Sequence, residues 1–161
     1  MSRPEDEPKA VLELREKIEA TLAKIYEDYV ADEAGMYVVG LDTARVFIVP
    51  TWLDEETTVI RLFAITNMDV PVTKELTSYL LAKNLEFVFG AFALDIDRGA
   101  VWFTHNLLGE FTAPEEMEAT LAAVSETAAE YDNEIKAKFG GRLYTEAPEE
   151  SVPSPAVPGY L

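Results

Sequence analysis

Cysteine is absent from the 161-residue chain, and this absence removes several classes of protein at once. Without thiols the chain has no disulfide scaffold, no zinc finger, no iron–sulfur ligation and no thiol nucleophile. Histidine is almost absent, because His105 is the only one, and a single imidazole cannot build a His-rich metal site. We therefore expect no metal centre and no cofactor, and we interpret His105, which lies in an apolar strand, as a structural or surface residue.

Basic side chains are scarce: 13 Lys and Arg stand against 30 Asp and Glu, for a net charge of −17. They form no stripe, so we expect neither nucleic acid nor an anionic membrane as partner. No apolar run approaches the ~20 residues of a membrane span, and the N-terminal residues are polar. These absences predict a soluble cytoplasmic protein without a signal peptide. We interpret the acidic surface first as a source of solubility, with an attraction for basic or polar peptide partners as the alternative.

Motifs of known catalytic chemistry are missing as well. No glycine-rich phosphate loop precedes a predicted helix, and no GxSxG elbow occurs. Asp54, Glu55 and Glu56 form a carboxylate run, which we interpret as a polar turn between strands. The sequence therefore predicts a protein that is not an enzyme.

The chain does contain a clear alternation of helical and strand periods, with 48% apolar residues. Apolar steps of three and four residues predict helices over 8–33, 73–84 and 113–139. Stretches rich in β-branched and aromatic residues predict strands over 36–41, 44–53, 57–66, 85–96 and 100–108. The last two strands flank Asp97-Arg98-Gly99, which is typical of a hairpin turn.

Single residues predict how these elements begin, end and pack. Gly35 is expected to end the first helix, and Asn84 to stop the second in a left-handed conformation. Thr112 and Glu115 have the spacing of a capping box for the third helix. Pro50 cannot donate a ladder hydrogen bond, so its strand should bulge or lie at an edge there. The helix positions expected to face the core are Val11, Leu14, Ile18, Leu22, Ile25, Tyr29, Leu76, Leu80, Leu81, Met117, Leu121, Val124, Ala128, Tyr131, Ile135 and Phe139.

The order helix, three strands, helix, two strands, helix predicts an α+β fold with one antiparallel sheet packed by helices. We expect a polar lead-in over residues 1–7 and a single domain over 8–144. Residues 145–161 are rich in Pro and Glu and predict a flexible tail.

The predicted sheet is apolar on both faces, because alternate residues of its strands are apolar in both registers. Such a sheet is usually covered on both sides, by helices or by another subunit, which points to a homodimer or to a peptide-binding surface. From its residues we select a candidate partner-binding set: Ile48, Trp52, Arg61, Phe63, Phe92 and Trp102.

Four segments together resemble a known family: the meander with TTVIRLFAITNMDV, the helix TKELTSYLLAKN, the hairpin FVFGAFALDIDRGAVWFTHNLLG and the closing helix ending YDNEIKAKFGGRLY. Their order resembles the type III secretion chaperone fold and, more closely, the YbjN-type domain proteins that share it. The resemblance implies a non-enzymatic protein. It further implies a homodimer that holds an extended, partly unfolded client segment without ATP, and it supplies no catalytic, cofactor or metal residue.

The residues and the resemblance together predict a chaperone-like or adaptor protein that binds an extended peptide segment of a partner along its sheet. The alternative is a structural or regulatory homodimer without a peptide groove. An enzyme or small-molecule binder would need a closed pocket with convergent polar groups. The terminal segment Val157–Leu161 is apolar, and we expect it either to fray or to dock on an apolar strip of the sheet.

Overall fold

The computed structural model describes residues 7–26, 28–32, 35–41 and 44–146. The elements, in chain order, are α1 (Lys9–Ile25), β1 (Tyr29–Ala31), β2 (Tyr37–Leu41), β3 (Ala44–Trp52), β4 (Thr58–Met68), α2 (Lys74–Asn84), β5 (Ala91–Asp95), β6 (Ala100–Leu108), α3 (Pro114–Phe139), β7 (Arg142–Leu143) and the short 3₁₀ helix η1 (Tyr144–Glu146).

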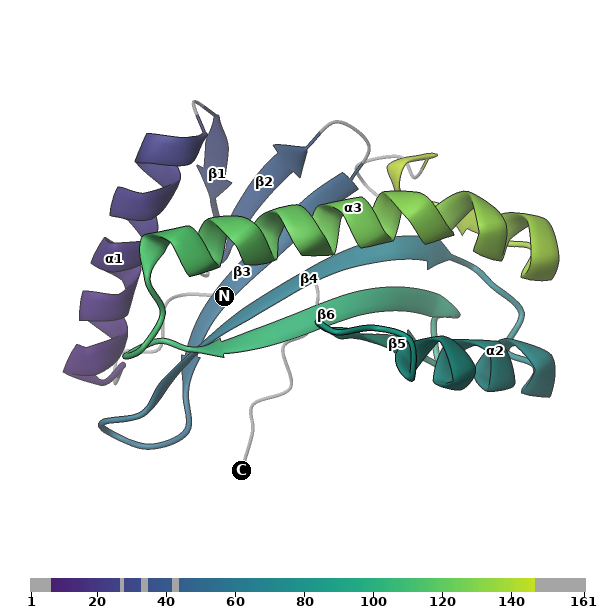
Figure 1. Cartoon of the computed structure of the whole chain (residues 1–161), viewed down its shortest axis with the longest axis horizontal. Helices are drawn as coiled ribbons and strands as arrows, with labels where there is room; N and C mark the ends of the chain where they lie inside the picture. Colours follow the sequence, from purple (N-terminus) through teal and green to yellow (C-terminus); the bar gives the residue numbers. More distant parts are fainter. Residues whose placement is uncertain (1–6, 27, 33–34, 42–43, 147–161) are drawn as a thin grey trace.

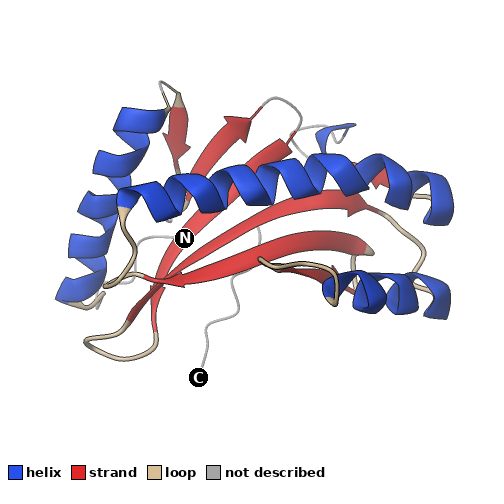
Figure 2. Ribbon diagram, in the orientation of Figure 1, coloured by secondary structure: helices blue, strands red, loops and turns tan. Residues whose placement is uncertain are grey.

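The strands form one antiparallel sheet with the order β1-β2-β3-β4-β6-β5, and β7 pairs with the far end of β4 (Figures 1 and 2). The five predicted strands are all present, but the one predicted over 85–96 is confined to Ala91–Asp95, because residues 85–90 connect α2 to the sheet without pairing. The short strands β1 and β7 are additions. The predicted α+β class is therefore confirmed.

The three α-helices pack on the same face of the sheet, where α3 crosses in front of the central strands in Figure 1. The main core lies between the two layers. It takes apolar side chains from every α-helix and from strands β2 to β6, among them Ile18, Leu22, Val39, Ile48, Leu62, Leu76, Phe103, Leu121 and Ile135. We call this side of the sheet the helix face. Burial of these side chains at roughly 25 cal/mol per Å² supplies the main stabilisation of the fold.

The first helix is shorter than predicted, because it ends at Ile25 and Tyr26 already has an extended backbone. Tyr29, predicted as a helical core position, lies in β1 opposite Val39. Its ring packs edge-on against Tyr37, with 6.1 Å between centroids. Strand pairing thus overrides the helical spacing beyond residue 25. Gly35 does not end the helix; it closes the β1–β2 turn with a positive φ of 80°.

Pro50 lies at an edge, which was one of the two predicted possibilities. β2 pairs with β3 only as far as Ile48, so Pro50 has a strand neighbour in β4 alone. The β3–β4 register runs through Pro50 without a shift. The hairpin turn at Gly99 is also confirmed, with φ 59°, and its close contact with the Val70 backbone leaves no space for a Cβ.

Two predicted helix-end features are wrong. Asn84 is not left-handed; its side chain accepts a hydrogen bond from the Phe92 backbone N–H and donates one to the Phe92 carbonyl. Thr112 forms no capping box, because its hydroxyl donates to the Leu108 carbonyl and the N-cap of α3 is Ala113. In both cases the side chain bonds to nearby backbone groups instead, Asn84 to Phe92 and Thr112 to Leu108, and so does not serve as the predicted helix cap.

Candidate functional site

The sheet face opposite the helices carries an apolar cluster of its own, and we call this surface the open face. Its buried members are Phe47, Val49, Phe63, Ile65, Met68, Ala100 and Tyr144, with Met36, Val38 and Trp102 partly buried against them. Among the described residues no α-helix contributes to this cluster, and the only member from outside the strands and the β2 entry is Tyr144 of η1. A sheet face without a helical layer is a surface for something else to cover.

Three aromatic side chains cross the open face as a row: Phe47 of β3, Phe63 of β4 and Trp102 of β6. Phe47 and Phe63 are directly opposite in the register, and their rings stack with 5.2 Å between centroids. Phe63 and Trp102 follow at 4.8 Å, and Tyr144 meets Phe47 edge-on at 6.0 Å. Pairs of this kind contribute about 0.5–1.5 kcal/mol each beyond the area they bury. The result is a continuous aromatic strip across three strands.

Polar groups accompany this aromatic row. Strand alternation places Arg45 and Arg61 on the open face, and Arg61 lies opposite Asn106 of β6. Burial raises the pKa of the Tyr144 hydroxyl, and the charge of Arg45 opposes that shift.

Two hydrogen-bond donors also belong to the open face. The indole Nε1 of Trp102 and the hydroxyl of Tyr144 are buried and have no hydrogen-bond partner within the described part of the chain. Apolar rings, cationic groups and such donors together suit an extended polypeptide, which offers apolar side chains, carboxylates and carbonyls.

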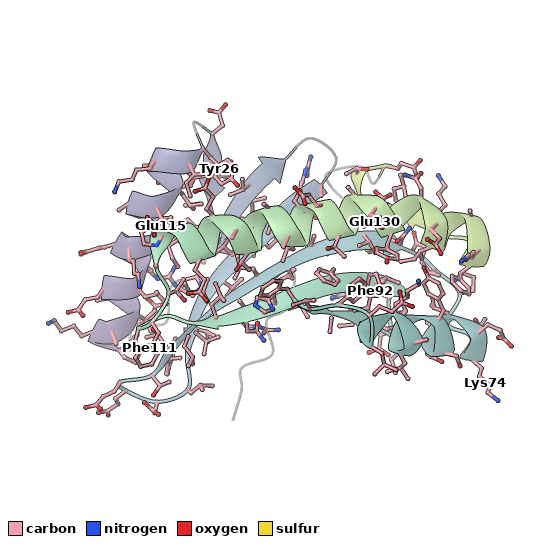
Figure 3. All side chains as sticks on the ribbon, in the orientation of Figure 1. Tyr26, Lys74, Phe92, Phe111, Glu115 and Glu130 are labelled. Carbon is pink, nitrogen blue, oxygen red and sulfur yellow. The ribbon has the colours of Figure 1, made fainter. Side chains whose placement is uncertain are left out.

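The structure separates the six sequence-predicted residues onto different faces. Arg61, Phe63 and Trp102 come together on the open face. Ile48 and Phe92 lie in the main core under the helices, with 0% and 6% of their surface exposed. Phe92 is labelled in Figure 3. Trp52 shares the parity of Ile48 and lies half-buried at the end of β3. The role of all six residues in partner binding stays a prediction.

Sequence reasoning missed a second exposed apolar surface, at the β5 edge of the sheet. Leu81, predicted to be buried, is 68% exposed, and Leu85, Val88, Phe89 and Ile96 are also exposed. We call these five residues the β5-edge patch. Leu81 follows the buried Leu80 directly, so the two side chains point about 100° apart around α2. Two adjacent leucines in a helix cannot both face the core, and apolar residues continue after this helix at Leu85, Val88 and Phe89. These two features of the sequence indicate an exposed apolar surface.

Asp54 and His105, the side chains considered for catalytic chemistry in the sequence, make structural contacts. Asp54 accepts hydrogen bonds from the backbone N–H groups of Glu56 and Thr57, which hold the pKa of its carboxyl below the usual value. His105 meets the ring of Phe89 edge-on at 5.8 Å. Within the described ranges no group of acidic or imidazole side chains could hold a metal ion. No helix of these ranges has the length and hydropathy needed to cross a bilayer.

A cleft of about 290 Å³ lies between α1 and the residues that follow β6. Two pairs of its polar groups bond to each other: Lys17 donates to the Gly109 carbonyl at 2.9 Å, and the Thr58 hydroxyl donates to Glu110 at 2.7 Å. Groups already paired in this way do not converge on a ligand.

Comparison with known proteins gives a family and two similar structures. Residues 12–147 match the family described as T3SS (YopN, CesT) and YbjN peptide-binding chaperone 1. No curated protein matches. The fold is similar to that of the Yersinia pestis type III secretion chaperone SycH, solved with a stable fragment of YscM2. This match has TM-score 0.54 and 19% identity, and it covers 73% of this chain and 98% of that one. It is also similar to a structure of the HopA1-SchA chaperone-effector complex, with TM-score 0.60, 13% identity and coverage of 78% and 99%.

The fold and the open face define a small binding protein of one helical layer on an antiparallel sheet, with no catalytic constellation among the described residues. The chain belongs to the family of T3SS and YbjN peptide-binding chaperones. It is a non-enzymatic chaperone that binds peptide segments of partner proteins. The family resemblance seen in the sequence is thereby confirmed.

Proposed function

We propose that the protein binds an extended segment of a partner on the open face, across the aromatic row. The observation that carries this proposal is an aromatic strip on the one sheet face that no described α-helix covers. An extended chain laid there buries its alternate apolar side chains against Phe47, Phe63 and Trp102. Such contacts tolerate sequence variation, as a chaperone requires, because burial of apolar surface has no directional preference.

The charge of the molecule favours clients with basic residues. At −17 the protein repels acidic chains and accelerates its encounter with basic ones, an effect that added salt screens. Arg45 and Arg61 are cationic exceptions on the open face itself, so basic client residues belong outside this strip, over the acidic surface around it. We therefore propose a client segment with apolar residues at its centre and basic residues in its flanks.

The β5-edge patch supports the predicted homodimer. Leu81, Leu85 and Val88 are 68%, 90% and 89% exposed, at one end of the sheet next to its last strand. A stable interface buries about 1,200–2,000 Å² in total, and exposed apolar side chains of this size are its usual centre. The patch shares no residue with the open face, so in this proposal a dimer formed here keeps both client surfaces accessible. The predicted cytoplasmic location also belongs to this proposal, and cell fractionation would test it.

Photo-cross-linking tests the client surface without disturbing the fold. A benzophenone amino acid is placed at Asn106, which is exposed and opposite Arg61, and at Glu118 on α3 as the matched exposed control. The probe is reduced and carboxamidomethylated lysozyme, a basic chain that stays unfolded. We expect irradiation to link the probe to position 106 at least tenfold more than to position 118. Equal labelling of both positions, or labelling of position 118 alone, would contradict the proposal.

A further inference from the structure

The open face is more deeply buried than its uncovered position explains. Phe63, Ile65 and Phe47 have only 2%, 4% and 5% of their surface exposed. Side chains on a sheet face without a covering layer face water. Among the described elements only η1 lies on this face, and it brings the single ring of Tyr144 against Phe47.

We propose that the open face is a polyproline-recognising strip and that its resident occupant is the chain's own segment 147–161. This segment carries Pro148, Pro153, Pro155 and Pro158. Proline fixes φ near the value of the polyproline II helix, so the segment loses little entropy on docking. Proline-rich chains of this conformation dock on surfaces lined with aromatic rings. The aromatic row is such a surface.

The hydrogen-bond donors of the open face match the same occupant. Trp102 Nε1 and the Tyr144 hydroxyl lack an acceptor within the described residues, although both atoms are buried. A polyproline II segment makes no internal hydrogen bonds, so its carbonyls are available as acceptors. A buried donor without an acceptor is costly, and a docked segment removes that cost.

The charge of segment 147–161 is opposite to that of the arginines on the open face, which favours this segment over an uncharged apolar one. The only side chains of this segment that are charged at neutral pH are Glu149 and Glu150, and it contains no Lys or Arg. Arg45 and Arg61 are the cations that strand alternation places on the open face. Arg45 interacts electrostatically with Tyr144, on the side of the Phe47–Phe63 pair where the segment begins, and Arg61 lies on the other side of that pair. In the proposed docking the segment therefore passes both cations, with Glu149 and Glu150 on the Arg45 side.

The chain leaves the described structure at the right place for this docking. Glu146 ends η1, and Tyr144 of the same turn already contacts Phe47. The aromatic row beyond it spans two ring-to-ring steps of 5.2 and 4.8 Å. A polyproline II chain advances about 3.1 Å per residue, so the segment reaches across the row with residues to spare. Its attachment also gives it a high effective concentration at the open face.

This inference rests on the proposed function in one respect: the segment occupies the surface proposed for the client, and a client must displace it. Docking of the segment can nevertheless be measured without any client. The experiment uses a Trp52→Phe background, which leaves Trp102 as the only tryptophan, and ends the chain after Ala147.

The synthetic peptide of residues 147–161 is then titrated into the shortened protein while Trp102 emission is recorded. We expect a red-shifted Trp102 emission on truncation, its reversal by saturable binding of the peptide, and at least tenfold weaker binding to the full-length chain. Arg61→Glu should weaken peptide binding at least tenfold, whereas Arg98→Glu in the β5–β6 turn, the matched control, should not change it. A peptide of the same composition in scrambled order should bind at least tenfold more weakly.

The inference fails if truncation leaves Trp102 emission unchanged, or if the peptide binds the full-length and shortened proteins equally. It also fails if the peptide binds neither protein. Should the shortened chain not fold, the full-length variant Pro153→Gly/Pro155→Gly gives the same readout, because it loosens docking at unchanged length. Cross-linking of lysozyme at position 106 is measured separately from the peptide titration. Client binding on the open face can therefore be confirmed while docking of the segment is contradicted, and docking can be confirmed while client binding is contradicted.

Discussion

At the residue scale, a buried ion pair fixes α1 to the segment before it and to the β1–β2 turn. The Arg15 guanidinium contacts the Glu7 carboxylate at 2.6 and 3.1 Å, and both side chains are 6% exposed. Arg15 also donates to the Gly35 carbonyl. Gly35 lies so close to the guanidinium that a Cβ would overlap it, and its φ is positive. One arginine therefore holds three separate stretches of chain together.

Replacing Arg15 by Met should lower the free energy of unfolding by about 3–5 kcal/mol, because Glu7 is then left as an unpaired buried charge. Chemical denaturation followed by circular dichroism measures this change. The double variant Arg15→Met/Glu7→Gln should recover part of the loss. The matched control is Lys9→Met, which breaks the exposed Lys9–Glu13 pair and should leave the denaturation midpoint unchanged. Equal effects of Arg15→Met and Lys9→Met would show that burial of the pair contributes nothing.

At the element scale, the parts of the fold with a long unbroken period could be predicted from the sequence. The seam of α3 is buried at Met117, Leu121, Val124 and Ile135 as expected, because a 26-residue helix repeats its signal many times. The end of α1 could not be predicted, because Tyr29 fits the helical spacing and only its partner strand decides otherwise.

The candidate site was predictable in part, for a related reason. Alternation separates Phe63 from Leu62 correctly, but it does not say which face the helices cover. Ile48 and Phe92 were therefore grouped with Phe63 and Trp102, although the helix layer covers the first two. The β5-edge patch was missed because Leu81 sits next to Leu80, and helix position alone does not show where the neighbouring sheet ends.

Asn84 joins α2 to the free edge of β5, and its removal should be measurable. Asn84→Ala deletes the bonds of 2.7 and 3.1 Å to the Phe92 backbone and leaves two polar groups of a strand unpaired. We expect a loss of about 1–3 kcal/mol and faster hydrogen exchange at the Phe92 amide. Ser78→Ala, at an exposed position of the same helix, should alter neither quantity. Unchanged exchange at Phe92 in Asn84→Ala would show that the side chain does not protect this edge.

At the scale of the whole molecule, two surfaces have different proposed roles: the open face binds a client and the β5-edge patch binds a second copy. Light scattering should give twice the chain mass of 17.9 kDa for the unaltered protein. Leu81→Glu/Leu85→Glu should give the monomer mass, because two carboxylates cannot be buried in an apolar interface. Phe111, labelled in Figure 3, follows β6. Phe111→Ser removes this apolar side chain, which is 80% exposed, and should leave the dimer intact. An unaltered protein of monomer mass at high micromolar concentration would contradict the dimer.

The client surface is the central claim, and methyl NMR of the isoleucines tests it most directly. Ile65 lies on the open face, Ile48 and Ile135 lie in the main core, and Ile96 belongs to the β5-edge patch. Titration with reduced, carboxamidomethylated lysozyme should shift or broaden the Ile65 signal and leave those of Ile48, Ile96 and Ile135 in place. An unchanged Ile65 signal at saturating probe, with Ile96 or Ile135 responding instead, would contradict binding on the open face.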